Sequence, residues 1–97
     1  MRDLEKVKEL ARDLRREEPR SSYEELGGEP HAARTLDKAR ATLAGTNGEF
    51  QFGCPMDQHF FEETGINMQE FENYVATGAS DAEVGEWIQQ HRSTRRS

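Results

Sequence analysis

Hydrophobic side chains recur three and four residues apart near the start of the chain. This spacing places them on one narrow face of a helix, and charged residues fill the other faces. The pattern predicts a helix over residues 3–17. We expect its stripe to dock on the rest of the domain or to pair with the same stripe of a second copy. The stripe consists of Leu4, Val7, Leu10, Ala11 and Leu14.

A change of composition separates this helix from the next hydrophobic stripe. Residues 19–30 are rich in Pro, Ser and Gly, which is typical of a loop, and Tyr23 and Leu26 are its apolar anchors. Hydrophobic residues then return at helical spacing and stop at Gly45, a common helix terminator. The sequence therefore predicts a helix over residues 31–44. Its stripe is Ala32, Leu36, Ala39 and Leu43.

Polar and apolar residues alternate from Glu49 to Phe52, after the turn signal Asn47-Gly48. Alternation is typical of a strand with one buried face, so we expect a short extended segment whose two Phe side chains point inward. The sequence shows no partner strand for it. Its backbone groups therefore need water, a loop or a second copy of the chain as partners.

Three further helices are predicted over residues 55–64, 68–77 and 81–91, each with start or stop signals. Pro55 stands in the first turn of the first of them, and Gly65 follows its last. The other two begin with capping-box patterns, in which a polar side chain is followed three residues later by Glu. The two pairs are Asn67 with Glu70 and Ser80 with Glu83.

Together these elements predict an all-α fold of about five short helices around one small aromatic-containing core, with the short extended segment near residues 49–52. A chain of 97 residues has the length of a single domain. Leu, Ile, Val and Phe make up only 16 of the 97 residues, so the core is small and a homo-oligomer is an open alternative. The expected parts are a charged N-terminal helix over 1–18, a loop over 19–30, a helical core over 31–91 and a mobile basic tail over 92–97.

Cysteine use and hydropathy indicate the compartment. The single cysteine, Cys54, has no partner for an intramolecular disulfide, and the first residues contain no apolar run of signal-peptide length. No stretch approaches the roughly 20 consecutive apolar residues that cross a bilayer. We therefore expect a cytoplasmic protein without a membrane role.

The net charge of −6 is unevenly distributed. Residues 1–40 contain ten acidic and ten basic residues, whereas residues 41–91 contain nine acidic residues and no Lys or Arg. Such a segment repels phosphate backbones, so we expect no nucleic-acid partner. The Gly-containing turn at 77–80 between two helices resembles that of a DNA-binding helix-turn-helix motif. The helix after it presents acidic side chains and no base, so we do not expect it to bind DNA.

The turn before the helix predicted at 55–64 carries the clearest candidate chemistry. A thiol at a helix N-terminus, such as that of Cys54, lies near backbone N–H groups that lower its pKa and make it a nucleophile. Asp57 and Gln58 are placed to orient a bound polar group. The alternative is structural: Cys54 fills the cap position and Asp57 bonds backbone donors. The spacing of Cys54 and His59 matches no compact zinc pattern, so we expect no metal and no cofactor.

Asp37 and Arg40 lie one helical turn apart on the flank of the stripe in the 31–44 helix. The simplest interpretation is a surface ion pair. The functional alternative is that Arg40 points toward the turn at Cys54 and receives an anionic ligand there. The candidate catalytic residue is Cys54. The candidate binding residues are Asp37, Arg40, Cys54, Asp57 and Gln58.

Several segments together resemble a known family. Leu-Asp-Lys-Ala-Arg-Ala at residues 36–41 and Cys-Pro-Met-Asp-Gln at residues 54–58 are the most specific of them. From Pro19 to Ile88 the chain resembles the bacterial domain-of-unknown-function family 5069 (DUF5069). The resemblance implies a small cytoplasmic protein, implies no reaction, and highlights the same five candidate residues. The other matching segments are 43–46, 48–50, 64–66 and 78–81.

We therefore expect a binding or interaction module rather than an enzyme. Its unknown partner is either a basic protein that meets the acidic C-terminal helices or a small ligand in a groove beside Cys54. The alternative is a thiol-dependent enzyme or redox-sensing protein that uses Cys54 at the helix N-terminus, assisted by Arg40 or Asp57. The lack of a second cysteine argues against a disulfide oxidoreductase.

Overall fold

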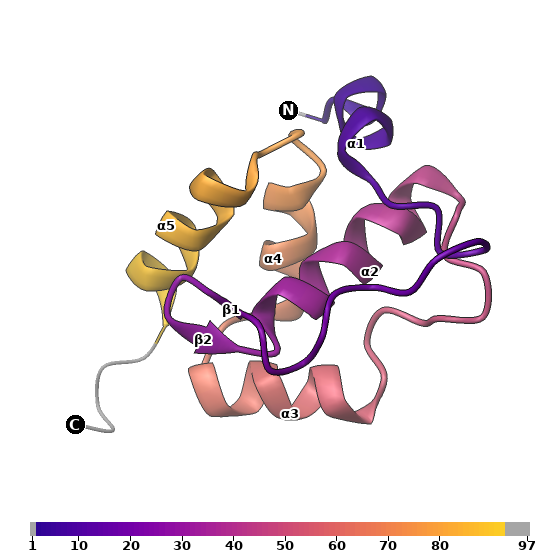
Figure 1. Cartoon of the computed structure of the whole chain (residues 1–97). Coiled ribbons are helices and arrows are strands. Elements are labelled where there is room, and N and C mark those ends of the chain that lie inside the picture. The colour runs from indigo at the N-terminus through magenta and orange to yellow at the C-terminus, as the bar shows by residue number, and fades with distance from the viewer. Residues whose placement is uncertain (1, 93–97) are drawn as a thin grey trace.

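The computed structural model describes residues 2–92 and contains five helices and one small antiparallel sheet. The elements are α1 (Leu4–Leu10), β1 (Glu25–Leu26), β2 (Glu29–Pro30), α2 (Ala32–Ala44), α3 (Pro55–Thr64), α4 (Met68–Val75) and α5 (Asp81–His91). The five expected helices are confirmed in this part of the chain, but the fold is mostly helical rather than purely all-α. Figure 1 shows α2 in the middle of the molecule, with the other helices arranged around it.

The central position of α2 follows from its side chains. Its alanines are small enough for neighbouring segments to approach closely, and Leu36 is fully buried among them. Three charged residues of α2 are also buried: Asp37, Lys38 and Arg40 are only 3%, 4% and 4% exposed. The expectation that Asp37 and Arg40 lie on a solvated flank is therefore wrong. Segments far away in the sequence cover that flank.

The C-terminal helices begin where local signals place them. The Ser80 hydroxyl accepts from the Glu83 N–H at 3.2 Å, and the Glu83 carboxylate accepts from the Ser80 N–H at 2.9 Å, so the capping box is confirmed. The Asn67 side chain accepts from the Glu70 N–H at 2.9 Å and caps α4. The helix α4 ends at Val75, slightly earlier than predicted.

The N-terminal helix is much shorter than the predicted span of residues 3–17. It ends at Leu10, because Ala11 adopts an extended conformation with ψ of 138°. The chain then turns so that Leu14 donates its N–H to the Thr46 carbonyl at 2.8 Å and buries its side chain. Docking of Leu14 outside the helix thus replaces the local helical pattern that its spacing suggested.

The extended segment predicted at residues 49–52 does not form a strand but a turn and loop. The Asn47 side-chain amide donates to the Phe50 carbonyl at 2.9 Å, which satisfies one of the backbone groups that lacked a partner strand. Both Phe side chains are expected to point inward. Phe52 packs against the core, and its ring stacks on that of Phe71 at a centroid distance of 6.2 Å. The Phe50 ring instead lies 5.8 Å from the Arg34 guanidinium.

The sheet forms instead in the segment predicted as a loop. Strands β1 and β2 pair antiparallel, Glu25 opposite Pro30 and Leu26 opposite Glu29. The two residues between them, Gly27 and Gly28, have φ of 62° and 78°. Positive φ at both central positions is typical of a type I′ hairpin turn, which the Gly-Gly dipeptide adopts without strain.

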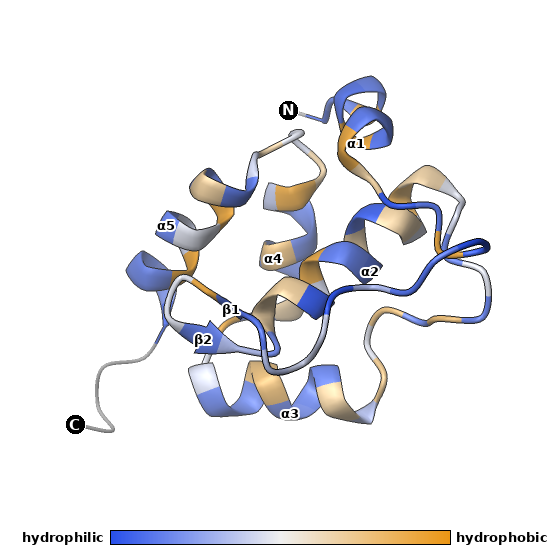
Figure 2. Ribbon diagram, viewed as in Figure 1, coloured by the Kyte–Doolittle hydropathy of each residue, from blue (hydrophilic) through white to orange (hydrophobic). Residues whose placement is uncertain are grey.

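The core lies between α2, α3, α4 and α5 and is rich in aromatic rings. Phe71 is fully buried and its ring lies within 5.5–6.2 Å of three other aromatic rings, those of Phe52, Phe61 and Trp87. Figure 2 shows the hydrophobic positions of α5 on the side turned toward α4. The rings thus supply much of the apolar surface that a chain with few aliphatic residues can bury.

Two further expectations concern the membrane and the C-terminal tail. None of the helices within residues 2–92 is long and apolar enough to cross a membrane. The predicted mobile tail begins at Arg92, and residues 93–97 lie outside the described part of the chain.

Candidate functional site

Asp57 lies in the first turn of α3, is 0% exposed, and organises the polar interior. Its Oδ1 atom lies 2.8 Å from Nε2 of His31 and 3.1 Å from the Thr35 hydroxyl. Its Oδ2 atom lies 2.9 Å from Nζ of Lys38 and accepts from the Gly53 N–H at 3.0 Å. We define the buried polar cluster as His31, Thr35, Lys38, Cys54 and Asp57.

Helical geometry explains why three of these residues meet at one carboxylate. His31, Thr35 and Lys38 are spaced by four and three residues, so they share one face of α2 and its N-cap. His31 itself has a φ of 72°, a left-handed conformation that residues other than Gly seldom adopt. Surrounding contacts must hold such a conformation in place, and the bond to Asp57 is one of them.

The charge state of Asp57 determines where the His31 proton lies. Burial raises the pKa of Asp57, but bonds from Lys38, His31 and the Gly53 N–H lower it more, so the net pKa is below the ordinary value of 3.8. The resulting carboxylate only accepts hydrogen bonds, so Nε2 of His31 must carry a proton. In the neutral ring Nδ1 is then a bare acceptor. This atom is buried and has no hydrogen-bond partner among residues 2–92.

Cys54 caps α3 and extends the cluster. Nζ of Lys38 donates to its Sγ atom at 3.0 Å. Burial raises the pKa of the Cys54 thiol, while the bond from Lys38 and N–H groups of the first turn of α3 lower it, and the net effect is a lowered pKa. Lys38 thus lies between a thiol and a carboxylate and contacts both.

The Gln58 side chain has a local role at the same turn. Its Nε2 atom donates to the Gly53 carbonyl at 3.1 Å, on the exposed side of the turn. Asp57 binds the N–H of Gly53 from the interior side. The two adjacent side chains therefore hold the turn before α3 from both of its faces.

Asp37 and Arg40 do not belong to this cluster. Asp37 binds the Arg20 guanidinium through both oxygens, at 2.8 and 3.0 Å, and Arg40 binds Asp81 at 2.8 Å and the Ala79 carbonyl at 2.9 Å. The expected pairing of Asp37 with Arg40, and the placement of Arg40 beside Cys54, are therefore corrected. Arg20 also binds Asp81 at 2.8 Å and so joins both pairs. We define the arginine network as Arg20, Asp37, Arg40 and Asp81.

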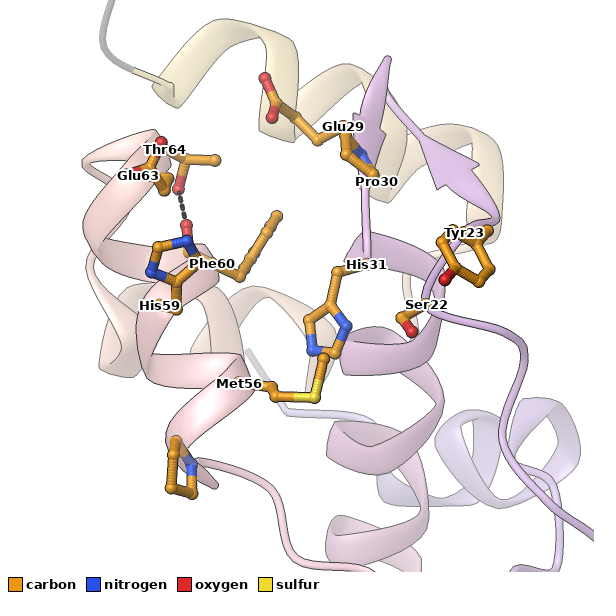
Figure 3. A pocket seen from close by; sticks show the side chains of 11 residues that line it. Ser22, Tyr23, Glu29, Pro30, His31, Met56, His59, Phe60, Glu63 and Thr64 are labelled. Atoms are coloured by element: carbon orange, nitrogen blue, oxygen red, sulfur yellow. Dashed lines mark hydrogen bonds between the residues drawn. The ribbon is translucent and has the colours of Figure 1, made fainter.

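A pocket of about 730 Å³ opens beside the buried polar cluster (Figure 3). One wall is α3 and the other is the segment from Ser22 to His31. Among the described residues that line it, His31 is the one member of the buried polar cluster. The lining residues are Ser22, Tyr23, Glu29, Pro30, His31, Pro55, Met56, His59, Phe60, Glu63 and Thr64.

The predicted site residues thus fall into two groups and leave the pocket wall unassigned. Cys54, Asp57 and Gln58 form the turn next to the pocket, whereas Asp37 and Arg40 lie in the arginine network. The sequence argument did not single out Lys38, Thr35 or the contact that His31 makes. Their spacing of four and three residues was the available signal. Within residues 2–92 no three His, Cys, Asp or Glu side chains form a group that could hold a metal ion.

Comparisons with known proteins identify a family without adding an activity. No curated protein matches the chain. A family model described as a domain of unknown function matches residues 16–97, which include the buried polar cluster, the arginine network and all residues that line the pocket. The chain belongs to the DUF5069 family.

Proposed function

We propose that this protein is a small-molecule-binding module and that its site is the pocket between α3 and the segment from Ser22 to His31. The observation that carries the proposal is the pocket itself, with its volume of about 730 Å³ and its largely apolar walls. Ligand sites for small molecules have volumes of roughly 300–1,000 Å³ and combine apolar walls with a few polar groups.

The exposure of two hydrophobic side chains supports this site. Tyr23 is 92% exposed and Met56 is 58% exposed, and both line the pocket. The other large hydrophobic residues exposed in residues 2–92 are Leu4 and Leu10, in α1. A chain with so few large hydrophobic residues gains no stability from leaving two of them in water at one cavity, whereas a ligand that covers them gains affinity.

Contacts outside the pocket hold its two walls in place. Asp57 of α3 bonds His31, which ends the opposite wall. Arg20 binds Asp37 of α2 and thereby fixes the chain just before Ser22. A pocket whose walls are fixed before binding loses little conformational entropy when a ligand enters.

A fragment screen by NMR tests this function. We expect some fragments to shift the resonances of pocket residues, and we expect Tyr23→Ser and Met56→Ser each to weaken their binding by about fivefold, through lost apolar contact. Leu10→Ser is the matched control, because it removes an exposed hydrophobic side chain from α1, away from the pocket. Fragments that bind equally well to all three variants, or the lack of any binding at the pocket, would refute the proposal.

Thiol chemistry at Cys54 is a second candidate, favoured by the ammonium of Lys38 at 3.0 Å from the sulfur. We expect the rate of Cys54 alkylation in the folded protein to rise with pH around a midpoint below that of a free cysteine, about 8.5. Lys38→Met is expected to raise this midpoint, because it removes the cation that stabilises the thiolate. Lys8→Met, on the exposed side of α1, is the control. A thiol that reacts only on unfolding would remove this candidate.

The free thiol also bears on location and assembly. Cys54 is the single cysteine of the chain and has no partner for an intramolecular disulfide, so we propose the cytoplasm as the site of action. The homo-oligomer expected from the small hydrophobic content remains a prediction, which the mass of the protein in solution would test.

A further inference from the structure

We infer that the pocket takes a flat aromatic ligand that carries an N–H or O–H donor and no negative charge, and that Nδ1 of His31 accepts the hydrogen bond from that donor. This inference rests on the proposed function and specifies its ligand class. It combines three independent features: an acceptor without a partner, aromatic walls, and the lack of Lys and Arg among the described lining residues.

The acceptor is the first feature. Asp57 fixes the proton of the His31 ring on Nε2, so the lone pair of Nδ1 is left without a donor among residues 2–92. Buried polar atoms nearly always have a partner, and the exceptions call for an explanation. His31 is only 9% exposed and lines the pocket, so a ligand is a source of the missing donor.

Met56 lines the pocket next to His31. Figure 3 shows its side chain pointing toward the His31 ring. The Met56 side chain is unbranched and 58% exposed, so it can rotate away without disturbing the core. A ligand beside His31 can therefore displace the thioether and keep a polarisable contact with the sulfur.

The walls favour a flat ring. Phe60 projects into the pocket, with its ring 6.3 Å from that of His31 and inclined at 54° to it. Tyr23 stands opposite α3, and Pro30 and Pro55 add rigid apolar surface. Aromatic side chains prefer offset or edge contacts with another ring, and prolines present flat faces that such a ring can cover.

The charge around the pocket disfavours anions. Two of its lining residues, Glu29 and Glu63, are acidic, and none of the described lining residues is Lys or Arg. Arg92, next to the pocket, is already paired with Glu29 at 2.7 Å. Helices α3, α4 and α5 add no base, since residues 41–91 contain neither Lys nor Arg. An anionic ligand would therefore lose hydration without finding a Lys or Arg among the described lining residues to pair with.

Four indoles test the inference as matched probes. Indole and 1-methylindole differ in the N–H donor, and tryptamine and indole-3-acetate share the ring but carry opposite charges. We expect indole to bind about fivefold more tightly than 1-methylindole, and tryptamine about fivefold more tightly than indole-3-acetate, at neutral to mildly alkaline pH. Titrations followed by NMR give the affinities and show whether the shifted resonances belong to the pocket.

The NMR resonance of His31 Nδ1 identifies the acceptor without any substitution. Indole is expected to move it and 1-methylindole is not. His31→Asn, which keeps a residue that tolerates positive φ, is expected to abolish the preference for the N–H compound, whereas His59→Asn in the same pocket is expected to keep it. If His31→Asn does not fold, the Nδ1 resonance of the unsubstituted protein still shows whether the ligand donates a hydrogen bond to this atom.

The outcomes separate the ligand class from the binding function. Equal binding of indole and 1-methylindole, or tighter binding of indole-3-acetate than of tryptamine, would overturn the inferred class. If other fragments occupy the pocket and no indole does, the inferred ligand class is also overturned, but the binding function is not. If neither the indoles nor any other fragment occupies the pocket, both proposals fall.

Discussion

Replacing Asp57 by Ala is expected to lower the free energy of unfolding by about 3–5 kcal/mol, the usual cost of breaking a buried ion pair from one side. The substitution leaves the Lys38 ammonium, which is 4% exposed, without its carboxylate. It also removes the acceptor for His31 and for the Gly53 N–H. Denaturant unfolding followed by far-UV circular dichroism measures the change.

A double-mutant cycle distinguishes loss of the ion pair from simple loss of packing. Lys38→Met alone leaves Asp57 buried and unpaired, whereas the double variant Asp57→Ala with Lys38→Met leaves no charge behind. We therefore expect the double variant to be about 2 kcal/mol more stable than the sum of the single losses predicts. Asp13→Ala, which removes a surface carboxylate bound to Arg15, is expected to change little. Additive losses at Asp57 and Lys38 would contradict the ion-pair explanation.

The same carboxylate contributes to acid sensitivity. The folded-state pKa of Asp57 is below its ordinary value of 3.8. Its stabilising effect is therefore complete above that ordinary value and is lost as the pH falls through the lower folded-state pKa. In Asp57→Asn we expect stability to fall less steeply as the pH drops below the ordinary Asp pKa of 3.8. The loss of stability in acid does not disappear, because the pKa of Asp81 is also lowered: burial raises it, but bonds from Arg20 and Arg40 lower it more.

Local chemistry in the sequence predicts the C-terminal half of the fold well. The start of α5 depends on Ser80 and Glu83, which bond each other's backbone within four residues. The end of α1 depends instead on Thr46, which draws Leu14 out of the helical path from 32 residues away. The hairpin at Gly27 escaped prediction for a related reason: strands of two residues carry no alternating pattern.

The candidate site shows the same division between local and long-range information. The turn at Cys54, Asp57 and Gln58 is local, and the sequence identified it. Lys38 and His31 reach this turn only because α2 packs beside α3, and no spacing in the chain specifies which face of α2 does so. Sequence reasoning singled out this turn, and its role as a site stays a prediction, but it could not find the partners of the turn's side chains or the pocket beside it.

Substitution of Gly27 by Ala is expected to lower the free energy of unfolding by about 3 kcal/mol, which combines a left-handed backbone with a steric clash. Gly27 has φ of 62°, and a Cβ atom there would lie 2.5 Å from the carbonyl oxygen of Gly85 in α5. The clash is with backbone atoms of Gly85, so no flexible side chain can move aside to relieve it. The hairpin would have to separate from α5, and the pocket wall that follows the hairpin would shift with it.

Gly45→Ala isolates the cost of the backbone conformation, because Gly45 has φ of 79° and a Cβ atom there meets nothing within 4 Å. We expect it to cost about 1 kcal/mol, and the difference between the two variants then measures how tightly the hairpin is held on α5. Equal losses would show that the contact between Gly27 and Gly85 relaxes freely and that this wall of the pocket is adaptable. A larger loss at Gly27, together with weaker fragment binding in that variant, would show that the close approach of two glycines positions the ligand site.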